Sequence, residues 1–384
     1  MRNLTSVSTG MLSSEYTADG TARAQKATIE DVKTQRLVVD PSNLETDESE
    51  KALDRAAQIL RAGGLVGLPT ETVYGLGANA LDRAAVEKIF IAKQRPAWDP
   101  IIVHIAGPNL GKAMLDPLVT DIPEAARKLM AAFWPGPLTL LLRRSRAVPD
   151  AVTAGRPLVG IRMPAHLVAL ELIRRAGVPV AAPSANTFGH TSPTTADHVL
   201  DDLDGRIDAV LDAGPTNHGI ESTVLDPCQT PMVIYRPGAI TTQQISDVAG
   251  AIELFSSAQP LVETPQSALP SPGVGLRHYA PNARLVLIEA PTPEAIESQI
   301  AEAARRFPGE RIGVMLPVEV PCAIAGAILF PWGRWSVPEE LAHGLYDGLR
   351  ALDAKGCAII LCPIPRGPGI CVAIRDRLNK AASR

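Results

Sequence analysis

Short strings of polar side chains follow segments with the length of buried strands. The first is LPTETVYGLG, from Leu68 to Gly77, where hydroxyls, a carboxylate and a phenol crowd into a turn. Thr70 and Thr72 are two positions apart, so in an extended chain their hydroxyls face the same side. Ligand-holding loops of α/β proteins follow strand ends, so the string predicts a ligand site, although a polar strand-to-helix turn with capping residues would also fit.

Two cations mark the next string, KQRPAWDPIIVHI, from Lys93 to Ile105. Pro96 keeps the preceding residue extended, so the side chains of Lys93 and Arg95 can point into one cavity. A planar guanidinium beside a point charge suits a polyphosphate, whereas a solvated helix end is the ordinary interpretation of such a pair. His104 ends the apolar strand behind them and favours a site, with a satisfied structural histidine as the alternative.

Later strands also end in polar side chains. Arg162 in VGIRMP emerges from a buried strand and needs an anion, because burying a lone cation is costly; a substrate carboxylate, a phosphate or a structural Asp would serve. Ser184 and Asn186 in APSAN offer hydroxyl and amide groups to a nucleotide. Ser222 begins a strand in GIESTVLD, and Arg236 stands before a proline that again extends the chain.

Several familiar catalytic motifs are missing. There is no GxxxxGK[ST] loop and no GxGxxG behind the first strand. The GxSxG and HExxH motifs are absent too, and no covalent nucleophile stands beside an obvious base. An enzyme built from these strings would work mainly by positioning charged reactants and stabilising phosphate charge.

The sequence around these strings predicts a mixed succession of helices and strands, which must position them. Helical faces occur from about Glu48 to Leu60 and over 83–92, 124–133, 167–176 and 195–203. Apolar strands are predicted at 65–68, 101–105, 138–142, 159–161, 178–182, 209–211, 222–225 and 233–235. Their short connections indicate one α/β domain.

Composition suggests four parts. Residues 1–45, rich in Ser, Thr and Ala, predict a flexible N-terminal extension with a short strand at 36–39. Residues 46–250 form the first domain, and residues 251–282, rich in Pro, Ser, Gln and Gly, form a linker. Residues 283–384 predict a small doubly wound α/β domain.

The sequence of the second domain also predicts where its strands and helices begin and end. Strands are predicted at 284–288, 311–315, 327–330 and 357–361, with helices at 293–307 and at the C-terminus. Another helix follows Trp335, where Ser336 and Glu339 form a predicted capping box, and it is expected to end at Gly356.

Bulk composition is that of a globular protein, with 384 residues, 46% hydrophobic and 20% charged. No apolar run reaches the roughly 20 residues that span a bilayer, so no membrane partner is expected. The net charge of −4 argues against strong nucleic-acid binding. Five cysteines without a CxxC pair predict buried free thiols and a cytoplasmic location.

In their order along the chain, these strings resemble the threonylcarbamoyl-AMP synthase family in its long two-domain form. SPGVGLRHYAP at 271–281 is similar to the family's linker, and GICVAIRDRLNKA at 369–381 to its last helix. The resemblance implies an α/β fold: a YrdC-like domain with a twisted mixed sheet and helices over roughly residues 50–245, then a linker and a small Rossmann-like domain.

The resemblance implies a nucleotidyltransferase, L-threonylcarbamoyladenylate synthase. It would use L-threonine, bicarbonate and ATP, release pyrophosphate, and supply a tRNA threonylcarbamoyl-transfer complex that modifies the adenosine next to the anticodon. Magnesium is expected with ATP, bound mostly through phosphate oxygens and water, without a tightly bound metal on the protein.

The resemblance also implies residue roles, none of them that of a covalent nucleophile. Threonine would be bound by Thr72, His104, Arg162 and Ser222, with the Ala182 backbone nearby. ATP would be bound by Arg95, Ser184, Ser192 and Arg236, with Lys93 supporting the phosphates, Asn186 and Asp99 beside them, and His278 and Tyr279 of the linker closing over the nucleotide.

Some positions depart from the family pattern. Asp99 stands where Asn is frequent, and its carboxylate would repel a triphosphate unless it helps to hold magnesium. Val274 and Leu276 give the linker a smaller apolar wedge, and Glu221 replaces a common Asp.

Two other functions stay open at this point. One is a non-catalytic RNA-binding module, which the acidic net charge and the 4% aromatic content disfavour. The other is a relative that uses carbamoyl phosphate, which the missing zinc-finger cysteines disfavour. The synthase hypothesis requires Arg95, Arg162 and Arg236 to converge with His104 on one cleft.

Overall fold

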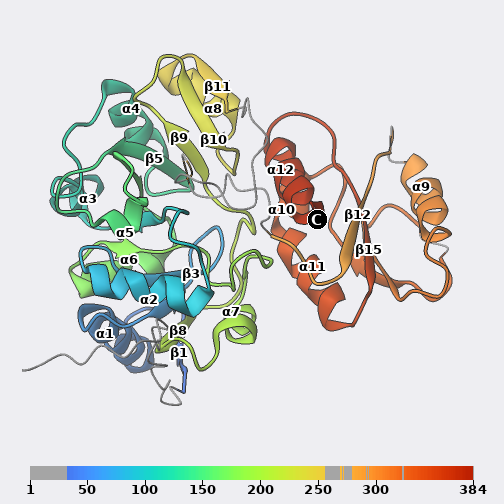
Figure 1. Ribbon diagram of the computed structural model, residues 1–384, viewed down its shortest axis with the longest axis horizontal. Helices are drawn as coiled ribbons and strands as arrows, with labels where there is room; N and C mark the ends of the chain where they lie inside the picture. Colours follow the sequence, from blue (N-terminus) through green and yellow to red (C-terminus); the bar gives the residue numbers. More distant parts are fainter. Residues whose placement is uncertain are drawn as a thin grey trace, which may run out of the picture. The chain divides into compact units, whose positions relative to one another are not determined.

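Two β-sheets organise the protein. The computed structural model describes residues 33–255, 269, 271, 279–290, 292, 294–321 and 324–383. Over these residues one sheet has eleven strands and the other has four (Figure 1). Both belong to one unit that begins at residue 32. Residues 1–32 of the predicted extension and most of the predicted linker lie outside the described residues.

The first sheet is mixed, as expected for a YrdC-like domain. Its strand order is β1-β8-β2-β3-β7-β4-β6-β5-β9-β10-β11, with both parallel and antiparallel neighbours. The strands are β1 (Gln35–Val38), β2 (Val66–Leu68), β3 (Gly75–Asn79), β4 (Ile102–His104), β5 (Leu138–Arg143), β6 (Leu158–Arg162), β7 (Val180–Ala181), β8 (Ala209–Asp212), β9 (Thr223–Asp226), β10 (Met232–Arg236) and β11 (Ile252–Leu254).

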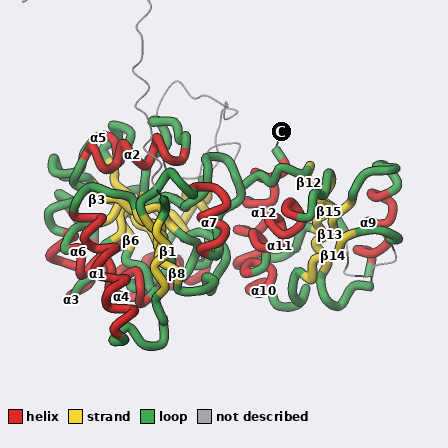
Figure 2. The backbone as a smooth tube through the Cα atoms, turned by 90° about the horizontal axis from the view of Figure 1, so that it is seen from below, coloured by secondary structure: helices red, strands yellow, loops and turns green. Residues whose placement is uncertain are grey.

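Helices surround this sheet (Figure 2). They are α1 (Asp47–Arg61), α2 (Arg83–Lys93), α3 (Pro108–Leu115), α4 (Glu124–Phe133), α5 (Asp150–Thr153), α6 (Leu167–Ala176), α7 (Ala196–Leu203) and α8 (Thr242–Ala249). Helix α1 shows why they form: the Thr46 side chain caps the Ser49 N–H, and an apolar stripe that includes Leu53 and Leu60 is buried. Gly63, at φ +75°, follows its end.

Two predicted boundaries of the first domain are wrong. The short strand expected at 36–39 exists as β1, and it pairs with β8, so residues 33–45 belong to the domain and not to a flexible extension. Strand β11 pairs with β10, although it lies inside the predicted linker 251–282. Both strands are short and lie at sheet edges, where few apolar residues are needed and the sequence signal is weak.

Strand β3 was expected to be part of a turn. Its sequence, GLGAN, lacks the branched and aromatic residues typical of strands. Glycine is required because neighbours approach closely: a Cβ at Gly77 would lie 2.8 Å from Leu68 Cδ2 and 2.9 Å from Val180 Cγ1.

The second sheet confirms the Rossmann-like prediction. Strands β12 (Arg284–Ile288), β13 (Ile312–Leu316), β14 (Ile328–Pro331) and β15 (Ile359–Pro363) pair only in parallel, in the order β12-β15-β13-β14. Helix α9 (Ala295–Ala304) packs in one apolar cluster with this sheet, and α10 (Pro338–His343), α11 (Leu345–Ala354) and α12 (Ile370–Ala382) pack in another.

The predicted capping box is wrong. The N-cap of α10 is Val337, which makes no side-chain capping bond. The Glu340 carboxylate, rather than Glu339, is engaged, and it accepts hydrogen bonds from Arg334. The single helix expected up to Gly356 is also divided at Gly344, where a Cβ would approach Trp332 Cδ1 to 3.3 Å.

The cysteines match the prediction where the structure describes them. Cys228, Cys357, Cys362 and Cys371 are free, and all but Cys228 are buried. Cys322 lies outside the described residues.

Candidate functional site

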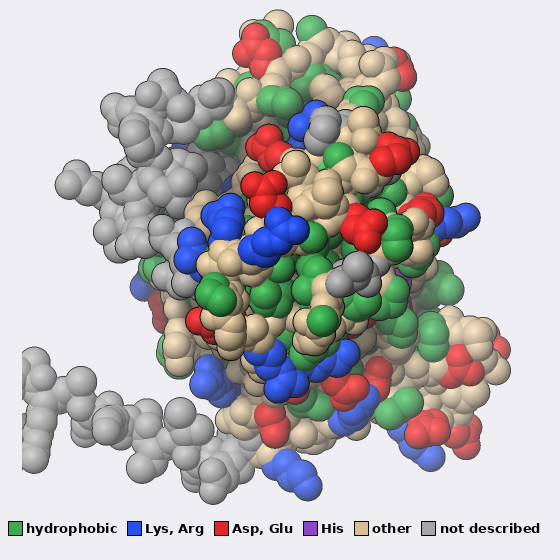
Figure 3. Space-filling model, turned by 90° about the vertical axis from the view of Figure 1, so that its right-hand side faces the viewer, with side chains coloured by type: hydrophobic (Ala, Val, Ile, Leu, Met, Phe, Trp, Pro, Cys, Tyr) green, Lys and Arg blue, Asp and Glu red, His purple; other side chains and the backbone are tan. Residues whose placement is uncertain are grey.

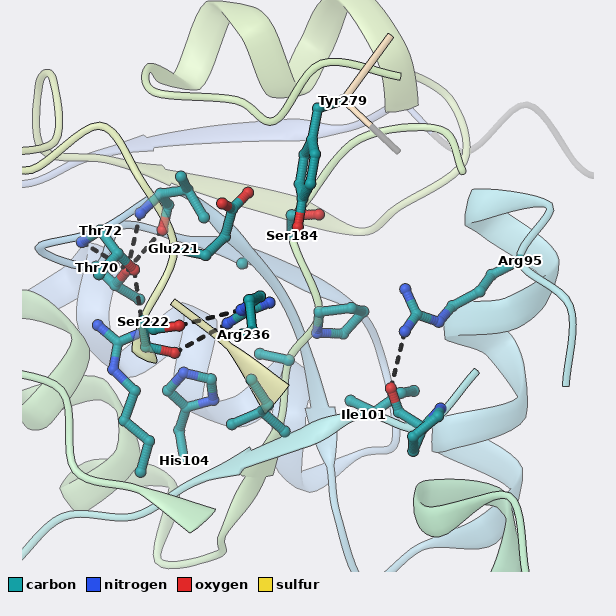
Figure 4. A pocket seen from close by; sticks show the side chains of 17 residues that line it. Thr70, Thr72, Arg95, Ile101, His104, Ser184, Glu221, Ser222, Arg236 and Tyr279 are labelled. Atoms are coloured by element: carbon teal, nitrogen blue, oxygen red, sulfur yellow. Dashed lines mark hydrogen bonds between the residues drawn. The ribbon is translucent and has the colours of Figure 1, made fainter. Parts of the chain in front are cut away.

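A cavity lies where loops at the strand ends of the first sheet meet. Its empty volume, which opens to solvent, is about 600 Å³. It is lined by Thr70, Thr72, Val73, Gly75, Arg95, Pro100, Ile101, Ile102, His104, Arg162, Ala182, Pro183, Ser184, Glu221, Ser222, Arg236 and Tyr279. In Figure 4, Thr72, His104 and Ser222 lie toward one end, Arg95 lies at the other, and Arg236 lies between them.

The turn after β2 is folded around one hydroxyl. Thr70 Oγ1 accepts the N–H groups of Thr72 at 3.2 Å and Val73 at 3.3 Å, and donates to the Val73 carbonyl at 2.6 Å. The two threonine hydroxyls lie 2.8 Å apart, so they do face one another. Thr70 therefore shapes the turn and directs Thr72 toward the cavity.

Arg162, at the end of β6, is held by two other segments of the chain. Its Nη1 donates to Thr72 Oγ1 at 3.0 Å, and its Nε donates to the Gly136 carbonyl at 3.3 Å. Its Nη2 forms an ion pair with Glu71 Oε1 at 2.6 Å. The anion expected for this arginine thus includes an internal glutamate, which the sequence analysis did not identify because the pair joins segments far apart in the chain.

His104 lies beside Arg162 in the paired strands β4 and β6. Burial, and then the Arg162 charge, lowers the pKa of His104 to about 3. The imidazole is therefore neutral near pH 7, and its Nδ1 has no hydrogen-bond partner among the described residues. A neutral ring with an unused nitrogen at a cavity wall can bind a polar substrate group.

Arg95 follows the left-handed Gln94 that ends α2. Its Nη2 forms an ion pair with Asp99 Oδ2 at 3.0 Å and donates to the Pro100 carbonyl at 2.8 Å. Its Nε donates to the Asp99 carbonyl at 3.2 Å. Asp99 is fully buried and is not among the cavity-lining residues, so its carboxylate neutralises Arg95 from behind.

Lys93 is not brought to the cavity. Its side chain is buried, and Nζ donates to the carbonyls of Ser184 and Asn186. Burial, and then the Arg95 charge, lowers the pKa of Lys93 well below its usual value. Lys93 therefore supports the loop that presents Ser184 to the cavity.

Two other residues that were predicted to bind the nucleotide lie behind the residues that line the cavity. Asn186 Nδ2 donates to the carbonyls of Thr187 at 2.8 Å and His190 at 2.9 Å, which organises the same loop. Ser192 Oγ donates to Glu221 Oε1 at 2.6 Å. Neither residue lines the cavity, whereas Glu221, which had no predicted role, does.

Arg236, at the end of β10, binds Ser222 twice. Its Nε donates to the Ser222 carbonyl at 3.0 Å, and its Nη2 donates to Ser222 Oγ at 3.0 Å. Ser222 Oγ also lies 2.8 Å from Thr139 Oγ1. The serine hydroxyl is thereby fixed at the cavity wall.

Tyr279 covers part of the cavity from the end of the linker. Its φ of +67° is uncommon for a residue other than glycine, and such strain is concentrated at functional sites. Thr191 Oγ1 donates to its carbonyl at 3.3 Å, and its ring stacks on Tyr346 at 5.6 Å. His278, Val274 and Leu276 lie outside the described residues.

The three arginines and His104 line one cavity, so the requirement set by the sequence hypothesis is met. Two of the guanidinium groups are paired with internal acids, yet they still face the empty volume between them. Within the described residues, no group of three or more His, Cys, Asp or Glu could hold a metal ion. None of the described helices is long and apolar enough to cross a membrane.

Two family models together match most of the chain. Residues 58–238 match the Sua5, YciO and YrdC family, described as telomere recombination. Residues 240–383 match the family described as the C-terminal domain of threonylcarbamoyl-AMP synthase.

Relatives that match over most of their own length carry names that agree with these family descriptions. The chain is 43% identical to the threonylcarbamoyl-AMP synthase of Bacillus subtilis over 91% of this chain and 98% of that protein. It is 41% identical to the Pyrococcus abyssi enzyme of the same name over 85% of this chain and 93% of the relative. The crystal structure of Pyrococcus abyssi Sua5 complexed with L-threonine is similar with a TM-score of 0.81 and 40% identity, covering 91% and 98% of the two chains.

Proposed function

The chain belongs to the threonylcarbamoyl-AMP synthase family, and from this membership we propose that it makes threonylcarbamoyl-adenylate from L-threonine, bicarbonate and ATP. The enzyme is of the nucleotidyltransferase type. The observation that carries the proposal is the single cavity in which Arg95, Arg162, Arg236 and the neutral His104 meet.

The chemistry has two balanced steps. The threonine amine attacks the carbon of bicarbonate and water leaves, which gives N-carboxythreonine. A carboxylate oxygen of that carbamate then attacks the α-phosphorus of ATP, the bond to the β-phosphate oxygen breaks, and pyrophosphate leaves. Neither step needs a covalent enzyme intermediate, which agrees with a cavity that offers positive charge and hydrogen-bond donors.

The end that contains Arg162 suits threonine. Arg162 can bind the amino-acid carboxylate, because a guanidinium offers more donors than its three protein contacts occupy. Thr72 and Ser222 supply hydroxyls, and the neutral His104 can bind the substrate without adding charge. A relative crystallised with L-threonine has the same fold, which supports this assignment.

The other end suits ATP. Arg95 and Arg236 offer two cations at the cavity wall, and Ser184 offers a hydroxyl between them and Tyr279. Fixed cations act on phosphate charge without reorganising during the reaction, which is how enzymes stabilise phosphoryl-transfer transition states. Lys93, Asn186 and Ser192 act on this end through the loops that they hold.

Magnesium fits this site as part of the substrate. The carboxylates nearest the arginines, Glu71, Asp99 and Glu221, are each engaged by a guanidinium. They do not form a protein cage for an ion, so Mg²⁺ would arrive on the phosphate oxygens of ATP with its own water. The ion would neutralise phosphate charge that the two arginines do not reach.

The product would be consumed by a complex that transfers the threonylcarbamoyl group to the adenosine next to the anticodon of tRNA, in the cytoplasm. A direct RNA-binding role is less well supported, because Arg162 and Arg236 are buried in the cavity and cannot follow a nucleic-acid backbone. On the face drawn in Figure 3, basic and acidic side chains are interspersed.

The test is pyrophosphate release by the purified chain, with threonylcarbamoyl-adenylate identified by mass spectrometry. Release should require both threonine and bicarbonate. Release without threonine, or from carbamoyl phosphate in place of bicarbonate, would replace this proposal by the carbamoyl-transfer alternative. ATP-independent RNA binding with no product would favour the RNA-binding module.

A further inference from the structure

The last helix of the chain carries a fully buried arginine. The Arg377 side chain, on α12, is 0% exposed, and its Nε donates to Glu221 Oε2 at 2.8 Å. Its Nη1 donates to Asp376 at 2.6 Å, and its guanidinium lies 5.3 Å from the centre of the Tyr279 ring. A buried guanidinium requires such partners, so Arg377 depends on the first domain as well as on its own.

Glu221 lies at the centre of these contacts. Its Oε1 accepts from Ser192 Oγ at 2.6 Å, and its Oε2 accepts from both Arg377 and the Tyr346 hydroxyl, the latter at 2.8 Å. Burial alone would raise the pKa of Glu221, but the charges of Arg377 and Arg236 outweigh it and the pKa is lowered. Glu221 is therefore an anion with both oxygens occupied.

This anion stands on the wall of the proposed substrate cavity. Glu221 lines the cavity and directly precedes Ser222, whose hydroxyl and carbonyl accept hydrogen bonds from Arg236. A carboxylate without its counter-charge at this place would repel a triphosphate, and the low dielectric of a buried site strengthens such repulsion. Two of its direct partners, the cation Arg377 and the hydroxyl donor Tyr346, come from the C-terminal domain, whereas the second cation that acts on it is Arg236 of the cavity wall.

We propose that Arg377 and Tyr346 are positioning residues for the nucleotide: Arg377 balances the charge of Glu221 and Tyr346 holds its carboxylate by a hydrogen bond, so that a triphosphate can occupy the cavity beside it. The inference rests on the proposed function and deepens it. It assigns the C-terminal domain a part in the reaction, because two of its side chains complete the charge balance of the cavity wall.

A second arginine of the C-terminal domain provides a matched control. Arg350, on α11, forms an ion pair with Asp202 Oδ2 at 2.6 Å and donates to the Thr191 carbonyl at 2.5 Å and, more weakly, to the Ser192 carbonyl at 3.4 Å. Asp202 is not among the cavity-lining residues. Replacing Arg350 therefore weakens the same domain contact and leaves Arg377 and Tyr346 on Glu221; of the Glu221 partners it touches Ser192 alone, through the long bond to the backbone carbonyl.

The experiment measures kcat and the KM values for ATP and threonine in the full-length chain. We expect Arg377→Met to raise the KM for ATP about tenfold or more and to change the KM for threonine less than about threefold. Combining it with Glu221→Gln should return the KM for ATP to within about threefold of wild type, because neither side chain is then charged. Arg350→Met should lower the melting temperature and leave the KM for ATP within about threefold.

Two further variants separate charge from folding. Arg377→Lys keeps the cation and should stay closer to wild type than Arg377→Met. Tyr346→Phe removes one hydrogen bond to Glu221 and keeps the ring stacked on Tyr279, so it should raise the KM for ATP more than Tyr74→Phe does. Tyr74 loses a part-buried hydroxyl contact of similar length, 2.7 Å to the Gly214 carbonyl, and it does not line the cavity.

The outcomes are distinct. A double variant as impaired as Arg377→Met alone, or an Arg350→Met protein with an equal rise in KM for ATP, would overturn the inference. If the wild-type protein makes no threonylcarbamoyl-adenylate, the proposed function fails. The dissociation constants of ATP for the same variants, measured by calorimetry, would then still decide whether Arg377 controls the charge of this wall.

Discussion

The two ends of the cavity hold their arginines in different ways. Arg162 is fixed by Glu71, Thr72 and Gly136, which come from two loops distant from β6 in the chain. Arg95 makes its polar contacts with Asp99 and Pro100, within its own loop. The polar contacts of Arg162 therefore come from the tertiary fold and those of Arg95 from a local turn, with the Phe188 ring 5.9 Å from the Arg95 guanidinium as a further, long-range contact.

This difference indicates what each end can tolerate. A group held from two distant segments keeps one orientation, which suits a small rigid substrate with a single carboxylate. A group held within its own loop moves with that loop, which suits a flexible triphosphate that several residues share. We therefore expect single substitutions to be more damaging at the threonine end.

The largest effect is expected for Arg162→Ala. The substitution removes the proposed carboxylate ligand and leaves Glu71 buried without its ion pair. Loss of one partner of a buried charge pair costs 2 to 5 kcal/mol, so the KM for threonine should rise by about 100-fold, with the dissociation constant for ATP changed by less than about threefold. Steady-state kinetics and calorimetry measure the two quantities. An unchanged affinity for threonine would remove the carboxylate assignment.

A smaller effect is expected for Arg95→Ala. The KM for ATP should rise by about tenfold, because Arg236 and the magnesium ion still carry part of the phosphate charge. Asp99→Asn in the same chain should recover part of the lost stability, since it removes the carboxylate left without its ion pair. If Arg95→Ala raised the KM for threonine as much as that for ATP, the two ends would not be independent.

Much of the fold could be predicted because its signals are local. Helices α4 and α6 have the predicted ends, since their apolar stripes are complete and Gly177, at φ +68°, stops α6. Strand β3 could not be foreseen, because its glycines are explained only by Leu68 and Val180 packed against them. The edge strands β1 and β11 depend on partners supplied by other parts of the chain.

The same distinction, between local signals and contacts from distant segments, holds for the site. Residues at strand ends, such as Arg162, His104 and Arg236, could be placed on one cavity because strand ends meet at a sheet edge. Their acid partners could not, because nothing in the sequence joins Glu71 to Arg162 or Glu221 to Arg377. Lys93 is a residue whose predicted place was wrong. Arg95 lines the cavity, but the Lys93 side chain points to the carbonyls of Ser184 and Asn186 instead.

Lys93 therefore gives a third prediction. Lys93→Met should raise the KM for ATP by about three- to tenfold, because the loop that presents Ser184 loses two hydrogen bonds to a charged donor. Hydrogen exchange at the amides of residues 184–188 should become faster. Protection unchanged from wild type, together with a higher KM, would mean that Lys93 contacts the phosphates after all.

The smallest effect on activity concerns His104 and pH. Its pKa in the folded protein is about 3, compared with an ordinary 6.5, because it is buried beside Arg162. The imidazole therefore stays neutral from pH 6.5 to 8, and titration of His104 should leave the KM for threonine nearly constant there. An NMR titration that placed its pKa near 6 would remove the neutral-imidazole assignment.

The same shift has a larger consequence for stability. Below pH 6.5 the unfolded chain binds a proton at this position that the native protein excludes, so stability falls as the pH drops from 6.5 toward 3. His104→Gln removes this proton and should move the midpoint of acid unfolding to lower pH. His198→Gln is the matched control: burial, and then the Arg350 charge, lowers the pKa of His198 to about 4, so it should shift the midpoint in the same direction without changing threonine binding. A His104→Gln protein that unfolds at the wild-type pH would show that the native ring takes up its proton as readily as the unfolded chain does, which contradicts a lowered pKa of His104.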